Sequence, residues 1–273
     1  MTVAYYVLVL LGVTAIGWHV GAARAFRSRI LQLAQSLHDA PPTRDLPTPL
    51  SPLVADFAHR AGAASGARMK TASFRQTAEL RLKPGGKFVT ISAWQVISLA
   101  RAGLVWDARR AIGPFTALRV LDSFVGAEGR LEARLFGSVP VARASGADIN
   151  LGEAYRYLAE LPWAPDAILG NPDLVWRVTG PDEAEVRLDT PEGTARVTFT
   201  FDGNGDIVGV LAKERPARTP DGKAATYEWR GRFGEYTQIG PRRLPAYGEV
   251  GYVYPGGYEV YFRGRISDYS VTS

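Results

Sequence analysis

The sequence contains no cysteine and only three histidines among its 273 residues. Without cysteine, the chain forms no disulfides and offers no thiolate nucleophile, Cys–zinc site or iron–sulfur cluster. All three histidines, His19, His38 and His59, precede residue 60. We therefore expect no Ser/His/Asp triad, histidine base or histidine metal site within residues 60–273, and no cofactor or metal.

Lysine is scarce as well, so arginine carries most of the positive charge. The formal net charge is +5, but the arginines are spread along the chain instead of forming the basic stripe or tail of a nucleic-acid binder. We expect no nucleic-acid partner. Charged residues make up 22% of the chain and hydrophobic residues 46%, which is typical of a globular protein with one large domain.

Charge is absent from a long stretch at the N-terminus. Residues 2–23 contain no Asp, Glu, Lys or Arg, and a helix of this length spans roughly 33 Å, which matches a bilayer core. We expect residues 1–23 to form a transmembrane anchor with Trp18 near an interface. A cleaved signal peptide is the alternative, because Ala23-Arg24-Ala25 resembles a small-x-small cleavage site.

The segment after the span has two parts. Residues 24–38 continue as an amphipathic helix, which we expect to extend the anchor along the membrane interface; its apolar face comprises Phe26, Ile30, Leu33 and Leu37. Residues 39–52 are a proline-rich linker. Because Arg24, Arg27 and Arg29 follow the span, the positive-inside bias predicts a single-pass protein with a cytoplasmic domain; an extracytoplasmic (periplasmic) domain is the alternative.

Residues 53–273 are expected to form one domain. After residue 68 the hydrophobic period changes from helical to two, and the run Phe88–Leu99 is apolar on both faces. Turn sequences separate the runs, among them Pro84-Gly85-Gly86, Asp202-Gly203-Asn204-Gly205 and Pro220-Asp221-Gly222. Short connections imply antiparallel neighbours. The sequence predicts a mainly β (α+β) fold: a large curved antiparallel meander sheet or half-barrel with one or two covering helices.

One of these helices is expected between the strands. Asn150 is predicted as its N-cap with Glu153 completing a capping box, and Pro162 limits its C-terminal end. The acidic turn from Asp202 to Asp206 is interpreted as a hairpin and not a calcium loop, because the positions that an EF-hand gives to Gly and Glu hold Ile207 and Lys213.

Four segments carry a resemblance to a known family: Val105–Arg109, Gly129–Val141, Gly152–Pro165 and Tyr261–Ile266. Together they resemble an uncharacterised bacterial family of membrane-anchored proteins, known only as a domain of unknown function. The resemblance spans roughly residues 70–271 and implies membrane anchoring but no activity. With the predicted span, we expect the protein in the bacterial cell (inner) membrane. More loosely, the expected fold is similar to the lipoprotein-carrier (Lol-type) half-barrel, which binds acyl chains between a curved sheet and covering helices.

The candidate ligand-binding residues are aromatic and charged positions expected near the cleft between sheet and helix: Trp94, Trp106, Arg109, Arg156, Tyr157, Glu160, Trp163, Trp176, Tyr261 and Arg263. For the tryptophans, ordinary core packing is the alternative. For Arg156 and Glu160, a surface pair four residues apart explains the spacing equally well.

These features favour a membrane-tethered, non-enzymatic protein that binds an apolar ligand, a lipid or acyl chain, in a sheet–helix cleft. The alternative is an envelope interaction or scaffold protein with a filled core, and the volume of the cavity distinguishes the two. A carboxylate-based hydrolase is the third reading and requires two converging acids with opposed pKa shifts. The expected partners are the membrane, a lipid ligand and, on the second reading, a membrane protein.

Overall fold

The computed structural model describes residues 2–44, 46, 49–219 and 223–273. The helices are α1 (Thr2–His38), α2 (Pro52–Arg60), α3 (Ala147–Ala159), the 3₁₀ turn η1 (Leu161–Trp163) and α4 (Pro165–Gly170). The first strands are β1 (Thr71–Arg81), β2 (Phe88–Ser98), β3 (Leu104–Ile112), β4 (Phe115–Val125), β5 (Glu128–Leu135) and β6 (Val139–Ser145). The later strands are β7 (Val175–Gly180), β8 (Glu183–Thr190), β9 (Gly193–Phe201), β10 (Ile207–Arg218), β11 (Ala224–Ile239), β12 (Arg242–Tyr254) and β13 (Gly257–Thr272).

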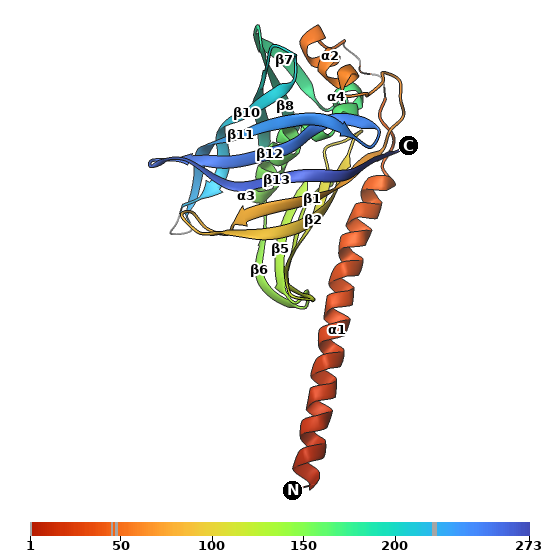
Figure 1. Cartoon of the computed structure of the whole chain (residues 1–273), viewed down its shortest axis with the longest axis vertical. Coiled ribbons are helices and arrows are strands. Elements are labelled where there is room, and N and C mark those ends of the chain that lie inside the picture. Colours follow the sequence, from red (N-terminus) through yellow and green to blue (C-terminus); the bar gives the residue numbers. More distant parts are fainter. Residues whose placement is uncertain (1, 45, 47–48, 220–222) are drawn as a thin grey trace.

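All the strands of the described chain belong to one antiparallel sheet. Its order is β6-β5-β4-β3-β2-β1-β13-β12-β11-β10-β9-β8-β7, so two meanders meet where β1 pairs with β13 (Figure 1). Successive strands are neighbours because the connecting turns are short. The predicted mainly β fold, a large curved antiparallel meander, is confirmed.

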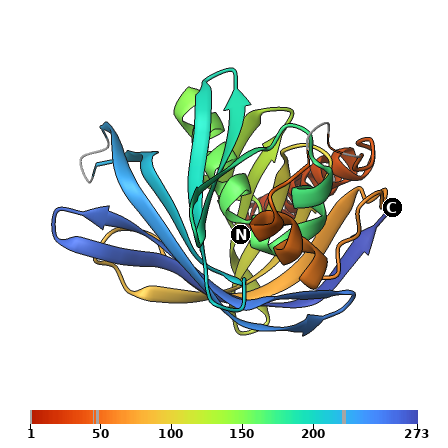
Figure 2. The ribbon, with the colours of Figure 1, turned by 90° about the horizontal axis from the view of Figure 1, so that it is seen from above.

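The chain passes from one edge of the sheet to the other through helices. After β6 it runs along α3, η1 and α4 before entering β7 at the opposite edge. Helix α3 contacts β4, β5 and β6 on one side and β8, β9 and β10 on the other. Figure 2 shows the sheet curving around these helices. The main core therefore lies on the concave face, where Phe74, Tyr157, Leu158 and Phe199 are buried.

The strands that are apolar on both faces are covered on both sides. Val96, Val105 and Leu121 of β2, β3 and β4 form a second cluster on the convex face. Side chains alternate between the two faces of a strand, so Ile97, Leu104 and Phe124 of the same three strands point into the main core on the concave face. The convex cluster receives Phe26, Ile30, Ala34 and Leu37 of α1. The C-terminal half of α1 thus packs on the sheet, in contrast to the expected position along an interface, because its apolar stripe matches these strands.

The N-terminal half of α1 extends beyond the domain (Figure 1). It continues the same helix without a break between the predicted segments 1–23 and 24–38. The described side chains from Ala4 to Trp18 are exposed. The helix is long and apolar enough to cross a membrane by length and composition, a test that an N-terminal signal sequence also passes. The anchor, like the other domain limits, stays a prediction.

Part of the proline-rich linker is attached to the domain. Thr43 is buried, its backbone N–H donates to the Met69 carbonyl at 2.7 Å, and its hydroxyl accepts from the Met69 N–H at 2.9 Å.

The predicted turn Pro220-Asp221-Gly222 lies outside the described residues. Helix α2 then places Val54 and Phe57 in the main core.

The predicted capping box of the interior helix is wrong. Helix α3 begins at Ala147 with Gly146 as its N-cap. The side chain of Asn150 instead accepts from the Gly129 N–H at 2.8 Å and donates to Glu192 at 2.7 Å. Glu153 is buried on the concave side, so it makes no capping contact. The sequence also gave no signal for β6, because this edge strand is exposed on both faces and lacks a buried alternation.

The histidines lie closer to the domain than the sequence predicts. His19 Nδ1 lies 2.6 Å from Ser138 Oγ, and His38 Nδ1 lies 2.8 Å from Thr71 Oγ1. Ser138 and Thr71 are each only 1% exposed, so these contacts join α1 to the sheet and present no accessible hydroxyl. His19 and His38 thus contact the folded domain although they precede residue 60.

Replacing Ile30 tests the attachment of α1. Ile30 is completely buried between helix and sheet, and Ile30→Ala is expected to lower the free energy of unfolding by about 2–5 kcal/mol through lost burial and a cavity. Denaturant unfolding of the full chain in detergent measures this. The neighbour Leu31 is 50% exposed, so Leu31→Ala should change stability by less than about 0.5 kcal/mol. Equal effects of the two variants would contradict the packing.

Candidate functional site

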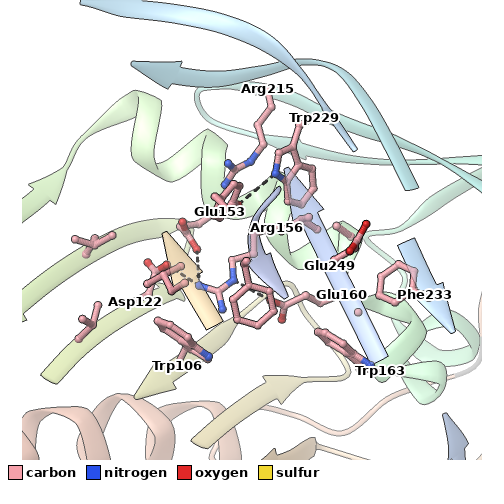
Figure 3. A pocket seen from close by; sticks show the side chains of 18 residues that line it. Trp106, Asp122, Glu153, Arg156, Glu160, Trp163, Arg215, Trp229, Phe233 and Glu249 are labelled. Atoms are coloured by element: carbon pink, nitrogen blue, oxygen red, sulfur yellow. Dashed lines mark hydrogen bonds and ion pairs between the residues drawn. The ribbon is translucent and has the colours of Figure 1, made fainter. Parts of the chain in front are cut away.

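A cavity of about 190 Å³ lies on the concave face between the sheet and the C-terminal half of α3 (Figure 3). Most of its lining is apolar, and the aromatic members are Trp106, Trp163, Trp229, Phe233, Tyr261 and Phe262. They come from β3, η1, β11 and β13, which are distant in the sequence. The curvature of the sheet brings them together. The consecutive residues Tyr261 and Phe262 both reach the cavity at a register shift in the β12·β13 ladder, where Val250 pairs with Phe262 and Gly251 with Val260.

The indole N–H groups of the cavity are already hydrogen-bonded. Trp106 Nε1 donates to Gln76 Oε1 at 2.6 Å, Trp163 Nε1 to the Pro245 carbonyl at 2.9 Å, and Trp229 Nε1 to the Tyr261 hydroxyl at 3.2 Å. These bonds fix the rings while their apolar surfaces line the cavity. Gly248 makes room for one ring, because a Cβ there would lie 2.7 Å from Trp163.

Arg156 of α3 is enclosed by carboxylates. It donates to Asp122 at 2.5 Å and to Glu160 at 2.8 Å, and Glu153 lies 3.8 Å away. Figure 3 shows its guanidinium between Asp122 and Glu160. The side chain is only 16% exposed, so the interpretation of Arg156 and Glu160 as a surface pair is wrong. Its charge is compensated within the protein, which leaves it little capacity to hold an anionic ligand.

Arg215 of β10 differs from Arg156 in its partners. It donates to the Tyr252 hydroxyl and, at 3.0 Å, to the Gly152 carbonyl, and its guanidinium lies 4.7 Å from the Trp229 ring centroid. Within the described ranges it forms no ion pair with a carboxylate at 4 Å or less, although the charge of Glu153 acts on it from farther away. A register shift in the β10·β11 ladder between Ala212 and Arg215 directs it inward.

Three buried polar atoms at the cavity have no hydrogen-bond partner: Asp122 Oδ1, Glu153 Oε2 and Arg215 Nε. Their residues are 7–8% exposed and come from β4, α3 and β10. Buried polar atoms without partners are uncommon because each costs about 1–3 kcal/mol. The three residues line the cavity, so a buried donor and buried carboxyl oxygens without partners stand at its wall.

The protonation of the two acids follows from their burial. Burial raises the pKa of Glu153 to about 8; the Asp122 charge adds to the shift and Arg156 opposes it. Burial also raises the pKa of Asp122, against the opposing charge of Arg156. Both pKa values move in the same direction, whereas an acid–base pair of the glycosidase kind needs opposed shifts.

The structure brings five of the ten candidate residues to the cavity: Trp106, Arg156, Glu160, Trp163 and Tyr261. The other five lie elsewhere. Trp94 packs against the cluster on the convex face, and Arg109, on the same face, forms an ion pair with Asp107 at 2.6 Å. Tyr157 is in the core and donates to the Ser98 carbonyl at 3.1 Å, Trp176 stacks on Phe199, and Arg263 pairs with Glu79 on the surface.

The list of candidate residues omitted five that also line the cavity: Asp122, Glu153, Arg215, Trp229 and Phe233. The sequence held one signal for Asp122: it has the same strand phase as Val120 and Phe124, so a charged residue stands at an inward position.

The turn at Asp202 is the predicted hairpin, with Asp202 Oδ1 accepting from the N–H groups of Asn204 and Asp206 at 2.9 Å. Within the described residues no group of three His, Cys, Asp or Glu side chains is placed to hold a metal.

The comparison with known proteins gives a family. The model of a family of unknown function (DUF6544) matches residues 40–264, which confirms the expected resemblance to such a family. No curated protein matches the sequence.

Solved structures show a distant likeness. A LolA superfamily protein from Nitrosomonas europaea is 10% identical with a TM-score of 0.42, covering 81% of this chain and 94% of that one. A DUF1329 family protein from Desulfovibrio piger is 10% identical with a TM-score of 0.45, covering 81% and 93%. An outer membrane lipoprotein-sorting protein domain from Vibrio parahaemolyticus is 10% identical with a TM-score of 0.46, covering 80% of this chain and 92% of that one. At this level of similarity these structures assign no ligand to this chain.

The raised pKa of Glu153 makes stability depend on pH. Between its ordinary pKa of 4.5 and about 8, the folded protein holds a proton that the unfolded chain releases. This contribution to stability is complete below pH 4.5 and is lost as the pH rises through 8. Glu153→Gln, which stays neutral, should therefore match the wild type in Tm near pH 5 and exceed it near pH 9.

Thermal unfolding across this pH range measures the difference. The control is Glu128→Gln, since the Glu128 side chain is 64% exposed and its replacement should leave the pH dependence unchanged. A Glu153→Gln variant with the pH dependence of the wild type would contradict a buried, protonated Glu153.

Proposed function

The chain belongs to the DUF6544 family of unknown function, and from its cavity we propose that it binds a lipid-like ligand without chemical conversion while α1 holds it at a membrane. The observation that supports this is the aromatic cavity of about 190 Å³ with three unpartnered polar atoms. The alternative reading, an interaction protein, requires a filled core at this place.

The size of the cavity limits what enters it. A cavity of about 150 Å³ holds a benzene molecule, whereas complete sites for larger ligands measure roughly 300–1,000 Å³. The proposed site therefore takes the polar end of a ligand and the first part of its apolar chain, and a longer chain continues outside. Each 100 Å² of apolar surface removed from water contributes about 2.5 kcal/mol.

The polar atoms define the polar end of this ligand. A hydroxyl group can accept from Arg215 Nε and donate to Asp122 Oδ1, and the protonated carboxyl of Glu153 can either donate to it or accept from it. With Glu153 protonated, the charges of the buried Asp122 and Glu160 balance those of Arg156 and Arg215, while Glu249, which also lines the cavity, is only half-buried. A ligand charge held among the buried groups would then have no buried counter-charge and would cost several kcal/mol. The proposed ligand is accordingly an amphiphile with a neutral hydroxyl or amide end.

The tether is the second part of the proposal. Residues 2–23 carry no formal charge and Arg24, Arg27 and Arg29 follow them, which supports a single-pass inner-membrane protein with a cytoplasmic domain. An extracytoplasmic domain is the alternative, and labelling of single introduced cysteines from either side of the membrane distinguishes the two.

Brominated amphiphiles test the ligand proposal, because bromine quenches tryptophan and Trp106, Trp163 and Trp229 line the cavity. Bromo-alkyl alcohol, carboxylate and ammonium compounds of one chain length are titrated into the full chain in amphipol at pH 7. The alcohol is expected to quench with saturation and to bind at least tenfold more tightly than either charged compound, a difference of about 1.4 kcal/mol or more.

The control is Ala159→Leu, which places a larger side chain at the cavity wall and should abolish saturable quenching by the alcohol. Identical quenching of wild type and Ala159→Leu would show partition into the amphipol and contradict the site. Saturable binding that favours the carboxylate would contradict the neutral polar end and leave the site itself in place.

A further inference from the structure

Large apolar side chains are exposed together at two neighbouring hairpin turns. The β3–β4 turn presents Ile112 and Phe115, and the β5–β6 turn presents Leu135, Phe136, Val139 and Val141. Phe115 is 67% exposed and Phe136 54%. Single exposed apolar residues are ordinary on a protein surface, whereas a cluster of this kind marks an interaction site.

The pairing of the strands places both turns at one end of the sheet. In the β4·β5 ladder Leu118 lies opposite Leu135, and the Phe136 N–H donates to the Ala117 carbonyl at 3.0 Å. We call these six exposed residues the apolar rim. Figure 1 shows the ends of β5 and β6 beside α1, on the side of the domain toward which the N-terminus extends.

Helix α1 touches the rim where it leaves the domain. His19 bonds to Ser138 and meets the Phe136 ring edge-on at 6.3 Å, and the Cβ of Ala23 is 3.7 Å from the position of a Cβ on Gly137. Toward the N-terminus the helix runs free, and Trp18 is 60% exposed. Residues 2–18 extend roughly 26 Å at about 1.5 Å per residue, close to the thickness of a hydrocarbon core.

The charges agree with an interface at this level. No formally charged residue precedes Arg24, which lies roughly 8 Å along the helix from His19 at about 1.5 Å per residue. With His19 at the edge of the hydrocarbon core, Arg24 would therefore lie in the headgroup layer, where its guanidinium can contact lipid phosphates. The rim therefore lies beside the part of α1 that changes from uncharged to basic.

Phe136 adds an independent observation. Its φ angle is 51°, in the left-handed region that a bulky residue rarely adopts. This backbone position holds the ring outward beside His19. The ring makes little contact within the domain, so the strained backbone at Phe136 favours a contact between this ring and a partner outside the domain.

We propose that the apolar rim inserts into the interface of the same bilayer that α1 crosses, so that the β3–β6 end of the sheet rests on the membrane. This proposal rests on the tether in the proposed function. The bilayer is the occupant that the structure favours, because the rim is continuous with the exposed apolar surface of α1. The domain then has a fixed orientation to the membrane, held by one helix and two turns.

Fluorescent labels at single introduced cysteines test the rim, since the chain contains no cysteine of its own. The full chain carries Leu10→Cys in α1, Phe115→Cys in the rim or Val178→Cys in β7, each with an environment-sensitive dye. Val178 is 45% exposed and lies in the strand at the opposite edge of the sheet. The proteins are placed in nanodiscs of phosphatidylcholine with a minority of phosphatidylglycerol, with and without brominated acyl chains.

The proposal predicts quenching by brominated lipid at positions 10 and 115 and none at 178. Quenching at position 10 alone would overturn the rim and retain the tether. A lack of quenching at position 10 would overturn the tether and the rim together. A label at 115 that is shielded from water but insensitive to brominated lipid would indicate a second copy of the chain on the rim and would also overturn the proposal.

A second variant keeps the test independent of folding. Phe136→Asn removes the exposed ring and places a residue that tolerates a positive φ. It should retain or raise the Tm of the protein and lower the quenching of the label at Phe115→Cys at least twofold. Unchanged quenching in a folded Phe136→Asn protein would count against insertion of the β5–β6 turn.

Discussion

The ion pair between Arg156 of α3 and Asp122 of β4 is the contact on which the arrangement of the concave face depends. It joins the helix that follows one edge of the sheet to a strand of the first meander, at 2.5 Å. Glu160 and Glu153 on the same helix share this guanidinium. Breaking a buried pair by removal of one partner costs about 3–5 kcal/mol, because the other charge is left uncompensated. The cavity is the space that remains once α3 is fixed in this way.

The position of α3 also explains the chemistry of the cavity. The helix contacts strands on both sides of the curved sheet, so its inward residues face Trp106 of β3 and Arg215 of β10 across one space. Glutamines extend the polar network, since Gln95 donates to Glu160 and Gln76 donates to Gln95. The network satisfies most buried groups of the site, and three of the unpartnered buried side-chain atoms among the described residues belong to residues that line this one cavity.

The sequence predicted the elements better than the site. Alternation was visible for strands such as β9 and β11 because one of their faces is buried, and it was invisible for β6, whose side chains are exposed on an edge. Within the site, strand phase separates Trp106 from Arg109, which lie on opposite faces of β3. Arg215 could not be identified, since the register shift that turns it inward depends on the pairing of β10 with β11. Helical spacing placed Arg156 with Glu160 correctly, but their burial depends on where the helix docks.

Native mass spectrometry of the full chain, released from mild detergent after purification from its own membranes, tests most directly whether the cavity holds a neutral amphiphile in the membrane-bound protein. We expect an adduct of one small amphiphile per chain that carries a hydroxyl or amide end, and its loss in the Ala159→Leu variant. Spectra that contain only the bare mass of the chain, or an adduct retained equally by that variant, would contradict it.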